Sequence, residues 1–112
     1  MTDFPGFGGI ADLLKHAREM GKQVGEVRER LRRETFSASV GGDLVKATVN
    51  GEGEVLRVEI DDALLTSDDR EMLEDLVAAA VNGATKKSRD RLRQEMSRLT
   101  GGIDVAGILG LS

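Results

Sequence analysis

Positively charged side chains gather in two stretches of this 112-residue chain, and they are the side chains best suited to hold an anionic partner. Residues 86–99 contain six bases and two acids, and residues 15–34 contain seven bases and four acids. Lysine and arginine bind a nucleic-acid backbone by releasing its counterions, and this binding needs no base-specific residues. The candidate phosphate-binding residues are Lys15, Arg18, Lys22, Lys86, Lys87, Arg89, Arg91, Arg93 and Arg98.

Acidic side chains dominate a third stretch, so the distribution of charge is more informative than its total. The formal net charge is −4, and residues 52–75 hold ten acids and two bases. Basic helices that project beyond an acidic body would attract double-stranded DNA, which needs no aromatic stacking residues and suits a chain without Trp or Tyr. Two alternatives stay open: an adaptor dimer that grips an acidic protein partner, and three solvated faces with no binding role.

The sequence offers no set of side chains typical of an enzyme. It has no cysteine, and His16 is its single histidine, so no nucleophile and base can be paired. Gly51 and Gly53 do not form a phosphate loop, because no Lys-Ser/Thr follows and the next segment is a predicted strand. The carboxylates of residues 61–75 lack the spacing and central glycine of a calcium loop. We therefore expect no catalysis, cofactor, metal site or small-molecule substrate.

The predicted centre of the fold is a hairpin. Residues 43–50 and 55–60 both alternate apolar and polar side chains, which is typical of strands with one buried face, and Val45, Ala47 and Val49 share that face in the first strand. Asn50-Gly51 is a strong hairpin-turn signal. Residues 35–40 alternate in the same way, so we expect a three-stranded antiparallel meander.

A long helix is predicted on the N-terminal side, over residues 10–33. Its apolar residues recur every three or four positions in a heptad pattern, which we call the seam. The seam consists of Ile10, Leu13, Ala17, Met20, Val24, Val27 and Leu31. Gly21 and Gly25 each cost about 1 kcal/mol relative to alanine in a helix, and close approach of another helix would compensate.

A second long helix is predicted over residues 68–99, with Ser67 as its N-cap. Asn82-Gly83 is a weak point in its middle, and the sequence leaves open whether it kinks the helix or marks where the helix leaves the sheet. In the connector before this helix, Ala63, Leu64 and Leu65 are expected to tuck under the sheet. The two helices would measure about 36 and 48 Å, whereas strands of six to eight residues span about 20–27 Å. We therefore expect both helices to double back across the sheet and to leave free ends at residues 10–22 and 86–99.

The domain boundaries follow from these elements. Residues 1–9 are expected to be a flexible N-terminal segment, 10–102 a single α+β domain, and 103–112 an apolar C-terminal tail. The aliphatic core is thin for two long helices, which favours a homodimer. No apolar run reaches the about 20 residues that cross a bilayer, and no signal peptide is evident, so we expect a cytoplasmic protein without membrane contact.

The order and spacing of these segments resemble those of the YbaB/EbfC nucleoid-associated proteins, from about Ile10 to Gly107. DLVKATVNGEGEVLRVEID is similar to the family's glycine-turn hairpin, LEDLVAAAVNGATKK to its LEDLI-AAVNDA-KK helix, and Met96 followed by LTGG to its helix exit. Two departures are Gly83, where the family usually has a polar residue, and Ala106-Gly107 in place of Pro-Gly.

The resemblance implies a specific fold and function. It implies an α-β-β-β-α homodimer shaped like tweezers, located in the cytoplasm and associated with the nucleoid. Such a dimer would bind duplex DNA with little or no sequence preference through basic helix residues. A role in chromosome organisation or gene regulation would follow.

Overall fold

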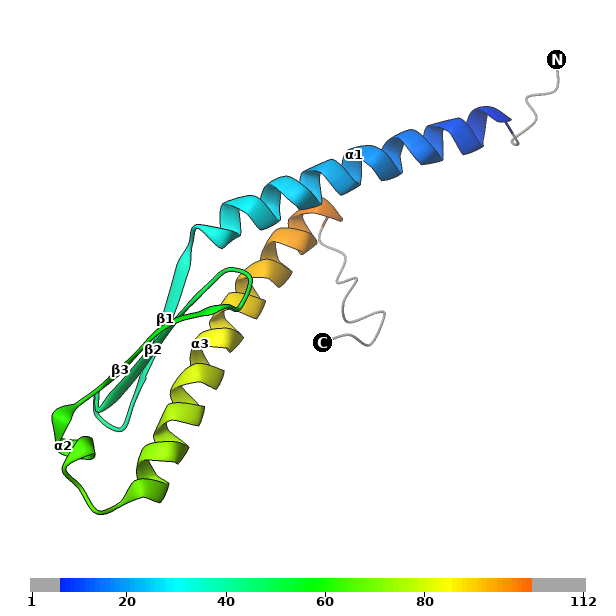
Figure 1. Cartoon of the computed structure of the whole chain (residues 1–112). Coiled ribbons are helices and arrows are strands. Elements are labelled where there is room, and N and C mark those ends of the chain that lie inside the picture. Colours follow the sequence, from blue (N-terminus) through cyan, green and yellow to red (C-terminus); the bar gives the residue numbers. More distant parts are fainter. Residues whose placement is uncertain (1–6, 102–112) are drawn as a thin grey trace.

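A computed structural model describes residues 7–101 of the chain and confirms the predicted α+β fold (Figure 1). The elements are α1 (Phe7–Arg32), β1 (Thr35–Val40), β2 (Val45–Asn50), β3 (Val55–Ile60), α2 (Asp62–Leu65) and α3 (Arg70–Leu99). The segments expected at residues 1–6 and 103–112 lie outside the described residues. Phe7–Gly9, expected to belong to the flexible N-terminal segment, form the first turn of α1.

The three strands form the predicted antiparallel meander in the order β1-β2-β3. Val45, Ala47 and Val49 of β2 are completely buried, which confirms the face predicted from their alternation. They pack with Ala80 and Ala84 of α3 to form the core cluster. The core therefore lies between one face of the sheet and a single helix, as expected from a short aliphatic chain.

Small side chains allow α3 to lie close to the sheet. Ala80, Ala84 and Ser88 are spaced four residues apart and are all buried, so they form one stripe of the helix. A Cβ atom at Gly83 would come within 3.0 Å of the Ala38 Cβ in β1. The helix continues through Asn82 and Gly83, and it does not leave the sheet there, because Gly83 packs closely against β1.

The start of α3 differs from the prediction by two residues. Asp69, not Ser67, is the N-cap, and its carboxylate accepts a hydrogen bond of 2.9 Å from the Met72 amide. A carboxylate caps strongly because its charge also favours the positive end of the helix dipole. In the connector Leu64 is buried as expected, but Leu65 is 60% exposed, since the single turn of α2 points it outward.

Only α3 doubles back across the sheet, and α1 projects away from it (Figure 1). The predicted return of α1 is wrong because α3 already covers the face of β1 and β2, and α1 instead packs its last turns on α3. Residues 9–23 of α1 are all exposed, and we call them the projecting half of α1. Residues 86–99 are not a free end either, since Ser88 and Glu95 are buried.

A glycine turn joins α1 to the sheet. The Gly51 amide donates a 2.9 Å hydrogen bond to the Leu31 carbonyl at the end of α1. A Cβ atom at Gly51 would lie 2.1 Å from that oxygen, so no other residue fits. Asn50 shapes the turn, because its Oδ1 accepts from the Glu52 and Glu54 amides and its Nδ2 donates to the Glu54 carboxylate.

Gly51→Ala is therefore predicted to lower the free energy of unfolding by about 2–4 kcal/mol, through the clash with Leu31 and the lost hydrogen bond. Urea unfolding followed by circular dichroism measures the change. Gly9→Ala is the control, because a Cβ there meets nothing within 4 Å and should change stability by about 1 kcal/mol or less. Equal stability of Gly51→Ala and the parent would contradict the role of this turn.

Candidate nucleic-acid interface

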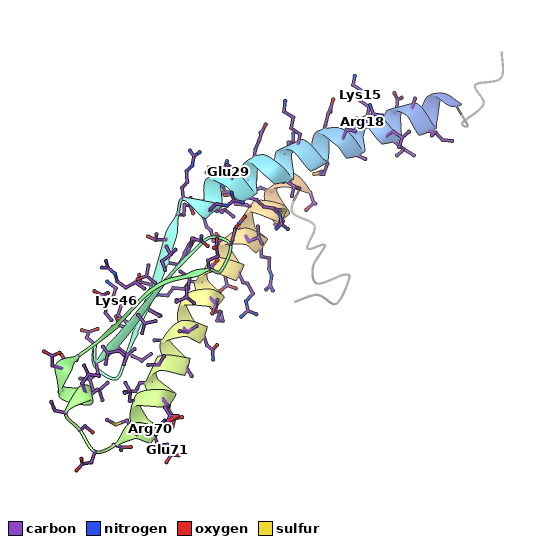
Figure 2. All side chains as sticks on the ribbon, viewed as in Figure 1. Lys15, Arg18, Glu29, Lys46, Arg70 and Glu71 are labelled. Atoms are coloured by element: carbon purple, nitrogen blue, oxygen red, sulfur yellow. The ribbon has the colours of Figure 1, made fainter. Side chains whose placement is uncertain are left out.

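The projecting half of α1 carries three of the predicted cations. Lys15, Arg18 and Lys22 are exposed, and none forms an ion pair within residues 7–101. Figure 2 shows Lys15 and Arg18 well beyond the sheet, on the part of the helix that no other element covers. Their charges are therefore available to an external anion.

Two further predicted cations stand on the exposed side of α3. Arg89 and Arg93 are one turn apart, both exposed, and neither forms an ion pair with the described part of the chain. Asp90 lies between them and is held by Lys86 at 2.9 Å. The hydrogen bond from Lys86, with the charges of Arg93 and Arg89, keeps the pKa of Asp90 below its usual value, so this carboxylate stays ionised.

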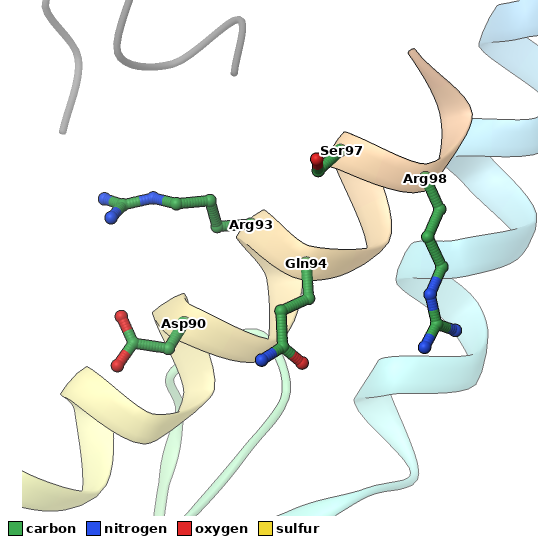
Figure 3. A pocket seen from close by; sticks show the side chains of 5 residues that line it. All are labelled: Asp90, Arg93, Gln94, Ser97 and Arg98. Atoms are coloured by element: carbon green, nitrogen blue, oxygen red, sulfur yellow. The ribbon is translucent and has the colours of Figure 1, made fainter. Parts of the chain in front are cut away.

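An open groove surrounds Arg93 on this side of α3 (Figure 3). It is lined by Asp90, Arg93, Gln94, Ser97 and Arg98. The Arg93 guanidinium reaches away from the helix axis, whereas Arg98 extends along the side that faces α1. Arg93 and Arg98 are five residues apart on one helix, but Arg93 points away from it and Arg98 lies on the side that faces α1.

Two lysines of α3 are bound within the chain but remain exposed. Lys87 donates a 2.6 Å hydrogen bond from Nζ to the Ser37 carbonyl in β1, and Lys86 is paired with Asp90. Exposed pairs of this kind contribute little to stability, so an incoming phosphate can compete for both ammonium groups. Their part in anion binding stays a prediction.

The last two predicted cations, Arg91 and Arg98, converge on Glu95 where α3 crosses α1. Glu95 is only 5% exposed, and its carboxylate contacts Arg91 and lies 3.2 Å from Arg98. Arg30 of α1 reaches the same carboxylate at 2.9 Å, and Arg91 also lies 3.3 Å from Glu34. We call these five residues the Glu95 cluster.

The Glu95 cluster is an electrostatic joint between the two long helices. The hydrogen bond from Arg91, followed by the charges of Arg91, Arg98 and Arg30, lowers the pKa of Glu95 and outweighs the opposing effect of burial. The same contact raises the pKa of Arg91. Because Arg91 and Arg98 already bind internal carboxylates, the geometry favours a positioning role for these two over direct phosphate contact, although the cluster keeps one net positive charge.

Sequence reasoning missed two residues here. Glu95 stands four residues after Arg91 and three before Arg98, a spacing that does signal pairs within one helix. Its third partner, Arg30, is 65 residues away, and only the helix crossing brings it close. Arg28 is exposed with no ion pair in the described part of the chain, and its place beside the hairpin turn follows from the same crossing.

Residues 7–101 offer neither a clustered metal site nor a membrane-spanning helix. The described residues contain no group of three His, Cys, Asp or Glu side chains placed to hold a metal ion. None of their helices combines the length and apolar character needed to cross a membrane.

Comparison with known proteins places the chain among DNA-binding proteins. Residues 7–103 match the model of the YbaB/EbfC DNA-binding family. A nucleoid-associated protein of Thermoanaerobacter sp. (strain X514) is 40% identical over 105 residues, which cover 94% of this chain and 95% of that protein. Another, of Desulfotalea psychrophila, is 40% identical over 96 residues, covering 86% and 91%.

A solved structure shares the fold. The crystal structure of an uncharacterized protein from Helicobacter pylori superposes with a TM-score of 0.67 at 25% sequence identity. The match covers 89% of this chain and 99% of that one, so the two proteins share their fold over most of their length.

Glu95→Gln is predicted to lower the free energy of unfolding at pH 7 by about 1–3 kcal/mol, because the arginines lose a buried anionic partner yet remain partly solvated. The pKa of Glu95 is lowered in the folded state, so its stabilisation is present above the unfolded value of about 4.3 and is lost as pH falls through the lower folded value. Urea unfolding between pH 7 and 3 measures both effects. A parent and variant that differ equally at pH 3 and pH 7 would contradict this account.

Proposed function

This chain belongs to the YbaB/EbfC DNA-binding family, and from that premise we propose that it binds the phosphate backbone of duplex DNA as a homodimer. One observation carries the proposal: five of the nine predicted cations are exposed and unpaired within residues 7–101. They are Lys15, Arg18, Lys22, Arg89 and Arg93. Cations left without internal partners can release counterions from DNA at full strength.

The charge is arranged so that a duplex approaches from one end of the molecule. Lys15 and Arg18 stand at the end where α1 projects, whereas Arg70 and Glu71 stand at the opposite, acidic end (Figure 2). The molecule measures 80 × 26 × 18 Å, so its basic end and its acidic end lie far apart along the long axis. An acidic end would be repelled by phosphate, which orients the protein on the backbone.

The readout is expected to be independent of sequence. Helix-borne lysines and arginines that contact phosphates fix position without reading bases. The chain has no Trp or Tyr and only three Phe, so stacking on single-stranded bases has little support. Together with the nucleoid-associated relatives, these features support a location on the nucleoid in the cytoplasm and a role in chromosome organisation or gene regulation.

A second copy of the chain would cover apolar surface that this chain leaves bare. Because α3 lies over β1 and β2, β3 is largely uncovered, and its Val55, Leu56 and Val58 are 50%, 55% and 36% exposed. An exposed apolar edge strand invites pairing with another chain. The seam of the projecting half is the other bare surface, with Leu13 70% exposed. A homodimer would bury this surface and double the number of basic helices.

Neutralising Arg89 and Arg93 together, as Arg89→Gln with Arg93→Gln, is predicted to make duplex affinity less dependent on salt. Each lost phosphate contact reduces the slope of log K against log[salt] by about 0.9, so a dimer that loses four contacts changes by about 3–4. Fluorescence anisotropy with a random-sequence duplex at several salt concentrations measures the slope.

The control for this experiment is Lys46→Gln with Arg70→Gln, which removes the same charge away from the basic end (Figure 2). It should leave the slope within about one unit of the parent, since few phosphates lie near those side chains. If both double variants changed the slope equally, net charge alone would govern binding and the proposed interface would be wrong.

Self-association is tested with one added charge at a time. Leu56→Asp on β3 and Leu13→Asp on the seam are each expected to shift the protein from dimer toward monomer in sedimentation velocity, because a buried unpaired carboxylate is costly. Ser39→Asp adds the same charge on β1, the opposite edge of the sheet, and should remain dimeric. A parent that sediments as a monomer would refute the homodimer.

A further inference from the structure

A groove lies where α1, the β2–β3 turn and α3 meet, and the sequence analysis did not predict a site there. Arg28 of α1 and Arg89 of α3 both border it. The two guanidinium groups come from helices that meet only because α3 overruns the sheet and crosses α1. Neither forms an ion pair in the part of the chain that the structure describes.

The floor of the groove contains a serine whose hydroxyl has no partner in the described part of the chain. Ser88 is only 2% exposed and borders the groove. Its hydroxyl makes no hydrogen bond within residues 7–101, although Thr85, one turn earlier, donates to the carbonyl of Asn82 in the same helix. Within residues 7–101 no fully buried side-chain oxygen or nitrogen lacks a hydrogen-bond partner, so this hydroxyl is accessible from the groove and its donor is available to a ligand or to water.

The glycine turn between β2 and β3 forms one border of the groove. Gly51 and Gly53 border it without side chains, so a ligand can approach the backbone there. Glu52, also at the border, is the one carboxylate in the lining, and Arg32 holds it at 3.0 Å. Because Arg32 compensates Glu52, the charges of Arg28 and Arg89 remain for an anion.

We propose that this groove is an oxyanion subsite that holds one phosphate of the DNA backbone between Arg28 and Arg89, with the Ser88 hydroxyl donating to a phosphate oxygen. The inference rests on the proposed function and deepens it, since it makes α1 and α3 grip one phosphate jointly. Guanidinium groups suit this role because they bind phosphate oxygens through planar, paired donors. The subsite would fix the register of the duplex on the body, while the projecting half of α1 follows the backbone outward.

Two single variants test the subsite by duplex anisotropy in the full-length protein. Arg28→Gln is expected to weaken affinity and to reduce the salt slope by about 0.9 per chain, because one ionic contact is lost. Ser88→Ala is expected to weaken affinity about threefold with an unchanged slope, because it removes a hydrogen bond but no charge. General charge attraction does not produce a loss of duplex affinity with an unchanged slope of log K against log[salt].

The matched control is Arg33→Gln, which removes one exposed charge directly after the end of α1, where Arg33 pairs with Glu29 at 3.5 Å outside the groove. It should keep the parent slope, and thermal melting should show all three variants folded. If Arg28→Gln and Ser88→Ala both bind as the parent does while the Arg89 and Arg93 double variant loses salt dependence, the subsite is wrong and the proposed function stands. A parent that does not bind duplex DNA overturns both.

Discussion

The architecture depends on a crossing of two helices that is held by charge. Glu95 is buried in α3 and receives arginines from its own helix and from α1, while Leu31 and Val27 of α1 are buried at the same crossing. Without this joint α1 would have little to hold it, since it makes few contacts with the sheet. The end of α1 is fixed a second time at the hairpin turn, by the Gly51 hydrogen bond to Leu31 and by the ion pair of Arg32 with Glu52 at 3.0 Å.

This joint explains why some arginines are available to a ligand and others are not. Arg30, Arg91 and Arg98 satisfy one buried carboxylate and thereby hold the helices at a fixed angle. Buried ion pairs gain little net free energy over apolar packing, but they are strongly directional. The Glu95 cluster can therefore set the direction in which the projecting half of α1 extends. The cations on either side of the joint are left exposed, so one set of arginines positions the other.

The sequence was sufficient for the parts of the fold that are governed by local signals. The meander and its buried face follow from period-two alternation and the Asn50-Gly51 turn, and both long helices follow from their apolar repeats. The course of α1 was mispredicted, because it depends on which helix covers the sheet first. Arg91 was grouped with the ligand-binding cations since its contact with Glu34 spans 57 positions, and no local pattern reports such a pair. Gly83 was taken for a weak point because its close neighbour, Ala38, is also distant in sequence, 45 positions away.

The central claim is that exposed cations of α1 and α3 without internal ion-pair partners are free to meet phosphates. The most direct measurement is the salt dependence of duplex binding by the unmodified protein. Six such cations on α1 and α3 in each chain of a dimer predict a slope of log K against log[salt] steeper than about −4, with equal affinity for unrelated duplex sequences. A slope close to zero, or binding confined to one duplex sequence, would contradict the account.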